Sequence, residues 1–169
     1  PSFLLQGARP LIGRIFTLFA LNKENAFSHA VSPTGASGIG QFMAGTYERV
    51  VKEYPQARLT PYFMEGTQNH LNSVKAMICL IDLEMNEMDP KIKEQFEKNP
   101  RSVEHYIPAL YNGGSGRAKD YLDLLDYTWD ESPNTSSSFV GKALMFETVI
   151  FLKKFKLIMR YLEENTITG

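Results

Sequence analysis

The chain has 169 residues, enough for one compact domain with a hydrophobic core. Hydrophobic residues make up 43% and charged residues 22%, which is the composition of an ordinary globular protein. The formal net charge of −1 argues against binding nucleic acid through overall charge, and no stretch reaches the roughly 20 apolar residues of a membrane span.

The hydrophobic pattern is helical nearly throughout. Pro10 opens a first helix that runs to about Lys23, with apolar residues at helical spacing that predict one buried face. Residues 28–40 are rich in Ser, Pro and Gly and predict a loop, after which a helix is expected from Gly40 to Glu53. The segment 54–66 carries two prolines and is expected to be mostly irregular.

Further helices are expected at about 68–86, 90–98, 102–110, 116–125 and 139–164, with a polar loop at 130–138. Strand signals are weak. The prediction is therefore one all-α domain over residues 1–169, with about seven helices and at most minor β structure.

Glu24 is the first residue that suggests chemistry, because it stands where an apolar helix meets a loop. A half-buried carboxyl group at such a place would have a raised pKa, as a general acid near neutral pH requires. A lone glutamate near a helix end is more often simply solvated. The residues that follow decide between the two interpretations.

The loop after Glu24 is rich in glycine, at positions 35, 38 and 40, and these glycines allow close backbone approach. Gln41 follows, and its amide can donate to and accept from sugar hydroxyl and acetamido groups. Far downstream, Tyr111 and Asn112 precede Gly113 and Gly114. This second motif offers polar groups to a cleft and is also typical of a helix C-cap.

Together these segments resemble the motifs of the soluble lytic transglycosylase catalytic domain, in the goose-type lysozyme-like superfamily. The family has Glu-Ser-x-aromatic, then Ser-x-x-Gly-Ala-x-Gly-Leu-Met-Gln, Met-Pro-x-Thr and Ala-Tyr-Asn-x-Gly. The corresponding segments here are Glu24-Asn25-Ala26-Phe27, Ser32-Pro33-Thr34-Gly35-Ala36-Ser37-Gly38-Ile39-Gly40-Gln41, Phe42-Met43-Ala44-Gly45-Thr46 and Ala109-Leu110-Tyr111-Asn112-Gly113-Gly114, the last with Leu110 as an inserted residue. The resemblance covers about residues 10–125.

The resemblance implies a lysozyme-like fold with a glycan-binding cleft and a catalytic acid/base at Glu24. Ser32, Gly38, Gln41 and Met43 would line the saccharide cleft, with Gly38 allowing close approach of the glycan. The resemblance also places Tyr111 near the catalytic carboxyl group and makes Asn112 a support of that wall. The substrate-binding residues that it implies are Ser32, Gly38, Gln41, Met43, Tyr111 and Asn112.

The chain departs from the family pattern in three places between residues 24 and 44. The loop between Glu24 and Ser32 is one residue shorter than in the family, and a gapless alignment would put Lys23 at the catalytic position. We place the acid at Glu24 because Phe27 then keeps the aromatic position. Asn25 replaces the family's Ser, and Ala44 its Pro.

The implied reaction cleaves the MurNAc-β-1,4-GlcNAc bond of peptidoglycan and forms a 1,6-anhydro ring on MurNAc, with substrate assistance in place of a second carboxylate. A second carboxylate would favour lysozyme- or chitinase-type hydrolysis, and Glu53, Glu104 and Asp120 are candidates by residue type. A third alternative is a non-catalytic glycan-binding or assembly module with the same fold.

No cofactor or metal is expected, since His29, His70 and His105 lack metal-ligand spacing. Cys79, the one cysteine, lies in an apolar run and is expected to be a buried hydrophobic residue. The expected partner is the peptidoglycan glycan strand, in the periplasm, the cell envelope or outside the cell. A secretion apparatus or a phage particle stays open as a further setting.

Overall fold

The computed structural model describes residues 8–98, 100–124 and 146–166. The predicted loop at 130–138 and the first part of the predicted last helix, 139–145, lie outside these ranges. The prediction of an all-α protein is confirmed: no strand occurs in the described residues, and β pairing there is limited to isolated bridges from Ser37 to Val31 and Phe42. In chain order the elements are α2 (Ala8–Asn22), the 3₁₀ turn η1 (Lys23–Asn25), α3 (Ala44–Glu53), the 3₁₀ turn η2 (Pro55–Ala57), α4 (Phe63–Gln68), α5 (His70–Asn86), α6 (Pro90–Lys98), α7 (Arg101–Gly113), α8 (Ser115–Leu124) and α10 (Phe146–Thr166).

Contacts between residues divide the chain into two compact units. The N-terminal unit comprises Gly13–Glu87, and the C-terminal unit comprises Pro1–Ile12 together with Met88–Gly169. Each unit is described below by itself.

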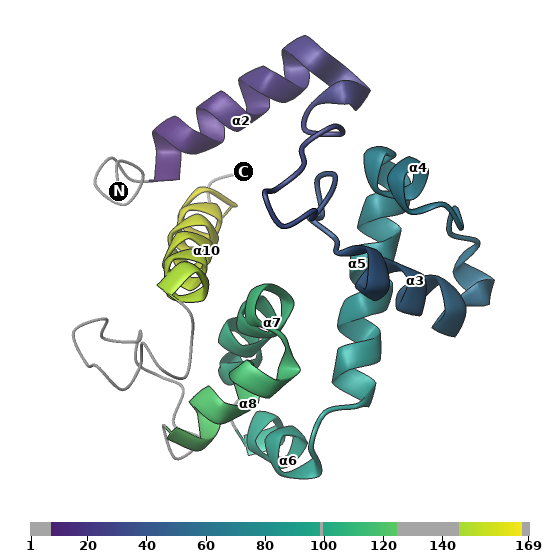
Figure 1. The fold of residues 1–169 in the computed structure, drawn as a ribbon. Helices are drawn as coiled ribbons and strands as arrows, with labels where there is room; N and C mark the ends of the chain where they lie inside the picture. Colours follow the sequence, from purple (N-terminus) through teal and green to yellow (C-terminus); the bar gives the residue numbers. More distant parts are fainter. Residues whose placement is uncertain (1–7, 99, 125–145, 167–169) are drawn as a thin grey trace. The chain divides into compact units, whose positions relative to one another are not determined.

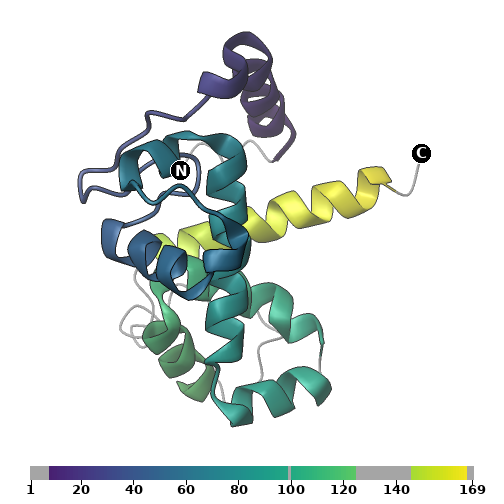
Figure 2. The same ribbon diagram turned by 90° about the vertical axis from the view of Figure 1, so that its right-hand side faces the viewer.

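In the N-terminal unit, α3 and α4 pack on the long helix α5, as Figures 1 and 2 both show. Tyr47 lies at the centre of this packing and has no exposed surface. Its ring meets the rings of Phe42 and Phe63 edge-on. Its hydroxyl group donates to the Thr60 carbonyl oxygen at 2.6 Å and accepts from Asn72 Nδ2 at 2.7 Å, so the buried phenol is fully hydrogen-bonded.

In the C-terminal unit, α7 packs against α6, α8 and α10. Phe96 of α6 meets Tyr106 of α7 at 5.2 Å between ring centres, and both are buried. Thr148 of α10 is buried and lies directly against Gly113 of α7, where a Cβ atom would come within 3.3 Å of it. The C-terminal helix is therefore part of the core of this unit.

Three expectations about the helices are wrong. Helix α4 forms in the segment 54–66 that was predicted to be irregular. It can form because both prolines of that segment, Pro55 and Pro61, precede Phe63–Gln68. Helix α3 begins at Ala44 rather than Gly40, since Gln41 has a left-handed backbone and Met43 is extended. The buried face expected for the first helix is absent, because every described side chain of α2 is half-buried or exposed.

Candidate functional site

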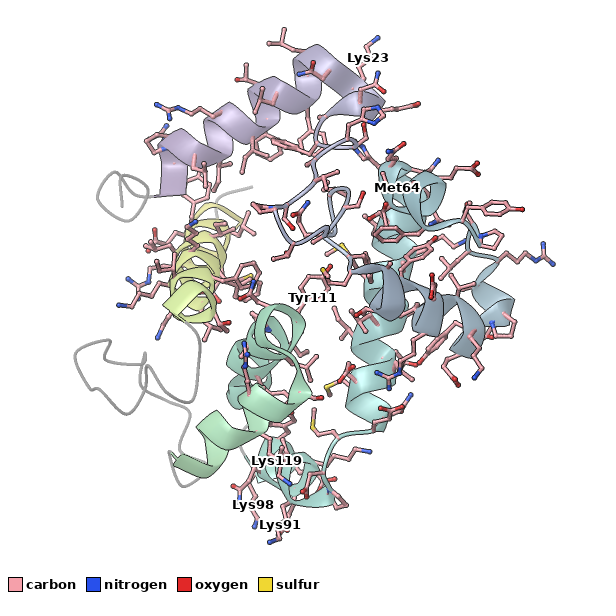
Figure 3. The ribbon with its side chains drawn as sticks, in the orientation of Figure 1. Lys23, Met64, Lys91, Lys98, Tyr111 and Lys119 are labelled. Carbon is pink, nitrogen blue, oxygen red and sulfur yellow. The ribbon has the colours of Figure 1, made fainter. Side chains whose placement is uncertain are left out.

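Glu24 lies on η1, the single 3₁₀ turn that follows α2. The turn is closed by a hydrogen bond of 3.2 Å from the Ala26 amide to the Lys23 carbonyl oxygen. The Glu24 side chain is exposed, so the expected half-burial is wrong in this structure. The reason is local: no residue of η1 is buried, and the turn extends the exposed end of α2, where Figure 3 shows the Lys23 side chain directed outward.

Backbone strain is concentrated around this turn. Lys23 and Phe27, on either side of Glu24, have φ angles of 48° and 61°, and Gln41 at the end of the loop has 48°. Among the described residues only one other non-glycine residue, Arg58, has a positive φ. A left-handed conformation is unfavourable for a bulky L-residue, and such outliers gather at functional sites. The strain therefore marks the same segment as the sequence motif does.

The loop between these strained residues is held by its own hydrogen bonds. Ser32 Oγ accepts from the Ala36 amide at 2.9 Å and shares a hydrogen bond with Thr34 Oγ1. The Ser32 amide donates to the Ala36 carbonyl oxygen at 2.8 Å. The half-buried Ser32 side chain thus shapes the turn at 32–36, as serine commonly does.

Gln41 uses its amide nitrogen inside the loop. Nε2 donates to the carbonyl oxygens of Gly38 at 2.8 Å and Ala30 at 3.3 Å. Within the described residues the Oε1 atom has no protein partner, and the side chain is exposed. The group that Gln41 can offer to a ligand is therefore an acceptor, suited to a sugar hydroxyl or an acetamido N–H.

Gly38 has a packing reason to be glycine. It is buried, its φ is 71°, and a Cβ atom there would overlap the backbone carbonyl group of Thr67 in α4. The structure therefore explains this glycine by contact with protein, whereas its predicted contact with a glycan stays a prediction. Thr67 completes the contact, since its hydroxyl group bonds the buried Ser37 Oγ at 3.0 Å.

His70 lies beside the turn that carries Glu24, although its place in the sequence does not suggest this. Its Nε2 lies 2.6 Å from the carbonyl oxygen of Ala26, two residues after Glu24. Its ring also meets the edge of Phe19, which in turn contacts Phe27. No pattern along the chain signals this pairing, because 44 residues separate Ala26 from His70.

The remaining predicted residues divide between the two units. Met43 is exposed at the start of α3, in the same unit as Glu24, Ser32, Gly38 and Gln41. Tyr111 and Asn112 lie in the last turn of α7 in the C-terminal unit (Tyr111 in Figure 3). The Asn112 side chain is exposed. Burial raises the pKa of Tyr111 to about 12, so its hydroxyl group stays protonated at neutral pH. That both residues face the Glu24 segment stays a prediction.

The second motif forms the C-cap of α7, as predicted, although its glycine is not in the left-handed helical conformation that the C-cap prediction implied, because the ψ angle of Gly114 is 157°. Gly114 follows α7 with a φ of 83°, and its amide donates to the Leu110 carbonyl oxygen at 2.8 Å. Glycine is the residue that accepts this conformation without strain.

Other chemistries find little support in the described ranges. No three His, Cys, Asp or Glu side chains there stand close enough to hold a metal ion. Cys79 is half-buried rather than buried as expected, and partial burial, followed by the charge of Asp82, raises the pKa of its thiol, which is the opposite of thiol activation. The side chains of Glu104 and Asp120 lie outside the described part, and Glu53 is exposed at the end of α3.

No helix among the described residues is both long enough and apolar enough to cross a bilayer. No protein-family model, curated protein or solved structure matches this chain.

Proposed function

We propose that this chain is a peptidoglycan lytic transglycosylase in which Glu24 is the general acid and base. The observation that supports the proposal most is the strained, hydrogen-bonded segment from Lys23 to Gln41. It holds an exposed carboxyl group and an unused amide acceptor in the order that the transglycosylase motifs have. Such a strained conformation costs about 1–3 kcal/mol for each residue. It persists only where the surrounding structure enforces it, and such residues cluster at functional sites.

The proposed reaction needs one carboxyl group and no water. Glu24 protonates the oxygen that links N-acetylmuramic acid to N-acetylglucosamine, and the bond from that oxygen to the anomeric carbon breaks. The neighbouring acetamido group stabilises the cationic sugar. The Glu24 carboxylate then removes the proton of the muramyl 6-hydroxyl, whose oxygen bonds to the anomeric carbon. The product is a 1,6-anhydro ring, and Glu24 is protonated again.

The proposed substrate sets the proposed location. Glycan strands of peptidoglycan lie in the cell envelope, so the chain would act in the periplasm or outside the cell, by itself or within a secretion apparatus or phage particle. The exposed side chains of Phe27, in the strained segment, and of Met43, two residues after it, offer apolar surface for sugar rings.

The decisive experiment compares the products that the wild-type chain and Glu24→Gln release from purified sacculi, by mass spectrometry. We expect anhydro-muropeptides from the wild type and a loss of about 10²–10⁴ in rate for Glu24→Gln. Glu48→Gln, another exposed glutamate of the same unit, serves as the control and should leave the rate unchanged. Equal activity of Glu24→Gln and the wild type would refute the assignment.

Two other outcomes identify the alternatives. Products with reducing ends would show a lysozyme- or chitinase-type hydrolase. The exposure of Glu24 favours a second candidate, a non-catalytic glycan-binding module, because an exposed carboxyl group lacks the burial that prepares a general acid. Saturable binding of glycan strands by the wild type, with no products released, would establish that candidate.

A further inference from the structure

A side chain at the start of α5 hydrogen-bonds the residue that follows the turn carrying Glu24. His70 is the first residue of α5, and its Nε2 lies 2.6 Å from the Ala26 carbonyl oxygen. A carbonyl oxygen can only accept, so Nε2 carries the hydrogen and donates it. The imidazole is therefore a donor to the backbone and is not free at this nitrogen to act as a base.

His70 is itself held in place. The Asn69 side chain caps α5 by accepting from the Asn72 amide at 2.9 Å, which fixes the first turn of the helix. The His70 ring packs edge-on against Phe19 with 5.7 Å between ring centres, and Phe19 lies at the same distance from Phe27. The donor therefore comes from a capped helix end and a cluster of three rings.

Ala26 is the residue through which this tie reaches Glu24. The Ala26 amide closes η1 on the Lys23 carbonyl oxygen, and the Ala26 carbonyl accepts from His70. Ala26 is buried, whereas no residue of η1 is buried, and the Asn25 carbonyl oxygen accepts from the amide and the hydroxyl group of the buried Ser28. The bonds on the two sides of Ala26 thus hold one end of a turn that core packing does not hold.

We propose that His70 is a positioning residue, which holds the Glu24 turn in place through its hydrogen bond to Ala26. The proposal deepens the proposed function and rests on it for the role of Glu24. The bond between His70 and the turn can be tested without any catalytic activity, so the two proposals can fail separately.

The test uses a pair of variants that separate the donor from the ring. His70→Phe keeps an aromatic ring against Phe19 and removes the donor, whereas His70→Gln loses the ring and restores an N–H donor of similar reach. Leu71→Ala, at the exposed neighbouring position of α5, controls for unspecific loosening of the helix.

The first readout is amide hydrogen exchange. We expect the amides of Ala26, Ser28 and Ala30 to exchange about five-fold faster in His70→Phe, the factor that one net hydrogen bond supplies. The amide of Tyr54 at the end of α3 should not change, and His70→Gln and Leu71→Ala should resemble the wild type. Unchanged exchange at Ala26 in His70→Phe, or an equal rise throughout the N-terminal unit, would overturn the proposal.

The second readout is the cleavage of sacculi. A misplaced acid lowers kcat without weakening the binding of glycan, so His70→Phe should lose about 10- to 100-fold in kcat at an unchanged KM. His70→Gln should recover most of this loss. A change in KM alone would overturn the positioning role. If the wild type cleaves nothing, the proposed function fails, and hydrogen exchange alone decides whether His70 holds the turn.

Discussion

At the scale of single residues, Gly38 has no room for a side chain. Its φ of 71° is one that L-residues avoid, and a Cβ atom would overlap the Thr67 carbonyl group. Gly35 in the same loop also has a positive φ, 88°, but it is exposed and nothing lies within 4 Å of a Cβ atom there. Substituting each glycine by alanine therefore separates the free-energy cost of an unfavourable backbone conformation from the cost of overpacking.

We expect Gly38→Ala to lower the free energy of unfolding by about 2–4 kcal/mol, because overpacking is added to backbone strain. Gly35→Ala should cost about 1 kcal/mol, from strain alone. Urea unfolding followed by circular dichroism measures both. Equal losses for the two variants would show that the Thr67 contact yields easily.

Some properties of single residues in the segment from Lys23 to Gln41 could be predicted from the sequence, and others could not. Gln41 could be singled out from its residue type, because glutamine can hydrogen-bond a ligand, whereas Gly38 was distinguished from Gly35 and Gly40 only by the resemblance to the transglycosylase motifs. The contacts of Gly38 with Thr67 and of Gln41 with Ala30 could not be predicted, because they depend on the folded conformation of the loop. The exposure of Glu24 was equally out of reach, because it depends on what packs around the end of α2.

At the scale of elements, a buried polar network joins α3, α4 and α5. Asn72 Nδ2 of α5 donates to the Tyr47 hydroxyl group of α3 and, at 2.9 Å, to the Gly66 carbonyl oxygen of α4. Asn72 Oδ1 accepts from the Thr60 amide at 2.8 Å, and Tyr47 donates to the Thr60 carbonyl oxygen. Removing one member takes a hydrogen-bond partner from its neighbours, of which Asn72 is buried and Thr60 is half-buried.

Tyr47→Phe should therefore lower the free energy of unfolding by about 1–3 kcal/mol, because buried groups lose a partner. Tyr54→Phe is the matched control, since the Tyr54 hydroxyl group bonds Asp82 at the surface and its loss should cost less than about 0.5 kcal/mol. Thermal or urea unfolding of the two variants, measured side by side, checks the difference. A Tyr54→Phe cost equal to that of Tyr47→Phe would contradict it.

The helices themselves were largely predictable, for a physical reason. The period of 3.6 residues and the prolines are local signals, and they place α5 and α6 to within a few residues of their observed bounds. Helix α4 was missed because six residues are too short to show a period, and it is held by the contact of Gly66 with Tyr47. Contacts between elements, such as His70 with Ala26, have no counterpart in local pattern.

At the scale of the whole molecule, charge is nearly balanced and some apolar surface is exposed. The net charge is −1 and the isoelectric point is about 6.4. Leu71, Val74 and Ile78 form an exposed apolar stripe along α5, with side chains three and four residues apart on one face. A protein with little net charge and an exposed apolar stripe tends to associate.

We expect the solubility of the chain to be lowest near pH 6.4, where repulsion between molecules vanishes. The double variant Leu71→Gln, Ile78→Gln should be more soluble at that pH without a change in its isoelectric point. Light scattering over a range of about pH 5 to 8, around the isoelectric point, measures the association of each protein. Equal scattering by the two proteins would mean that the stripe on α5 plays no part in association.

The left-handed residues on either side of Glu24 have a consequence for chirality. At positions 23 and 27 the backbone follows the path that the mirror-image form of an amino acid prefers. A chain made by chemical synthesis with D-lysine at position 23 would keep the charge of that residue and remove its steric conflict with the backbone. The turn that presents Glu24 is thus a place where a D-residue would fit the native backbone better than the natural L-residue does.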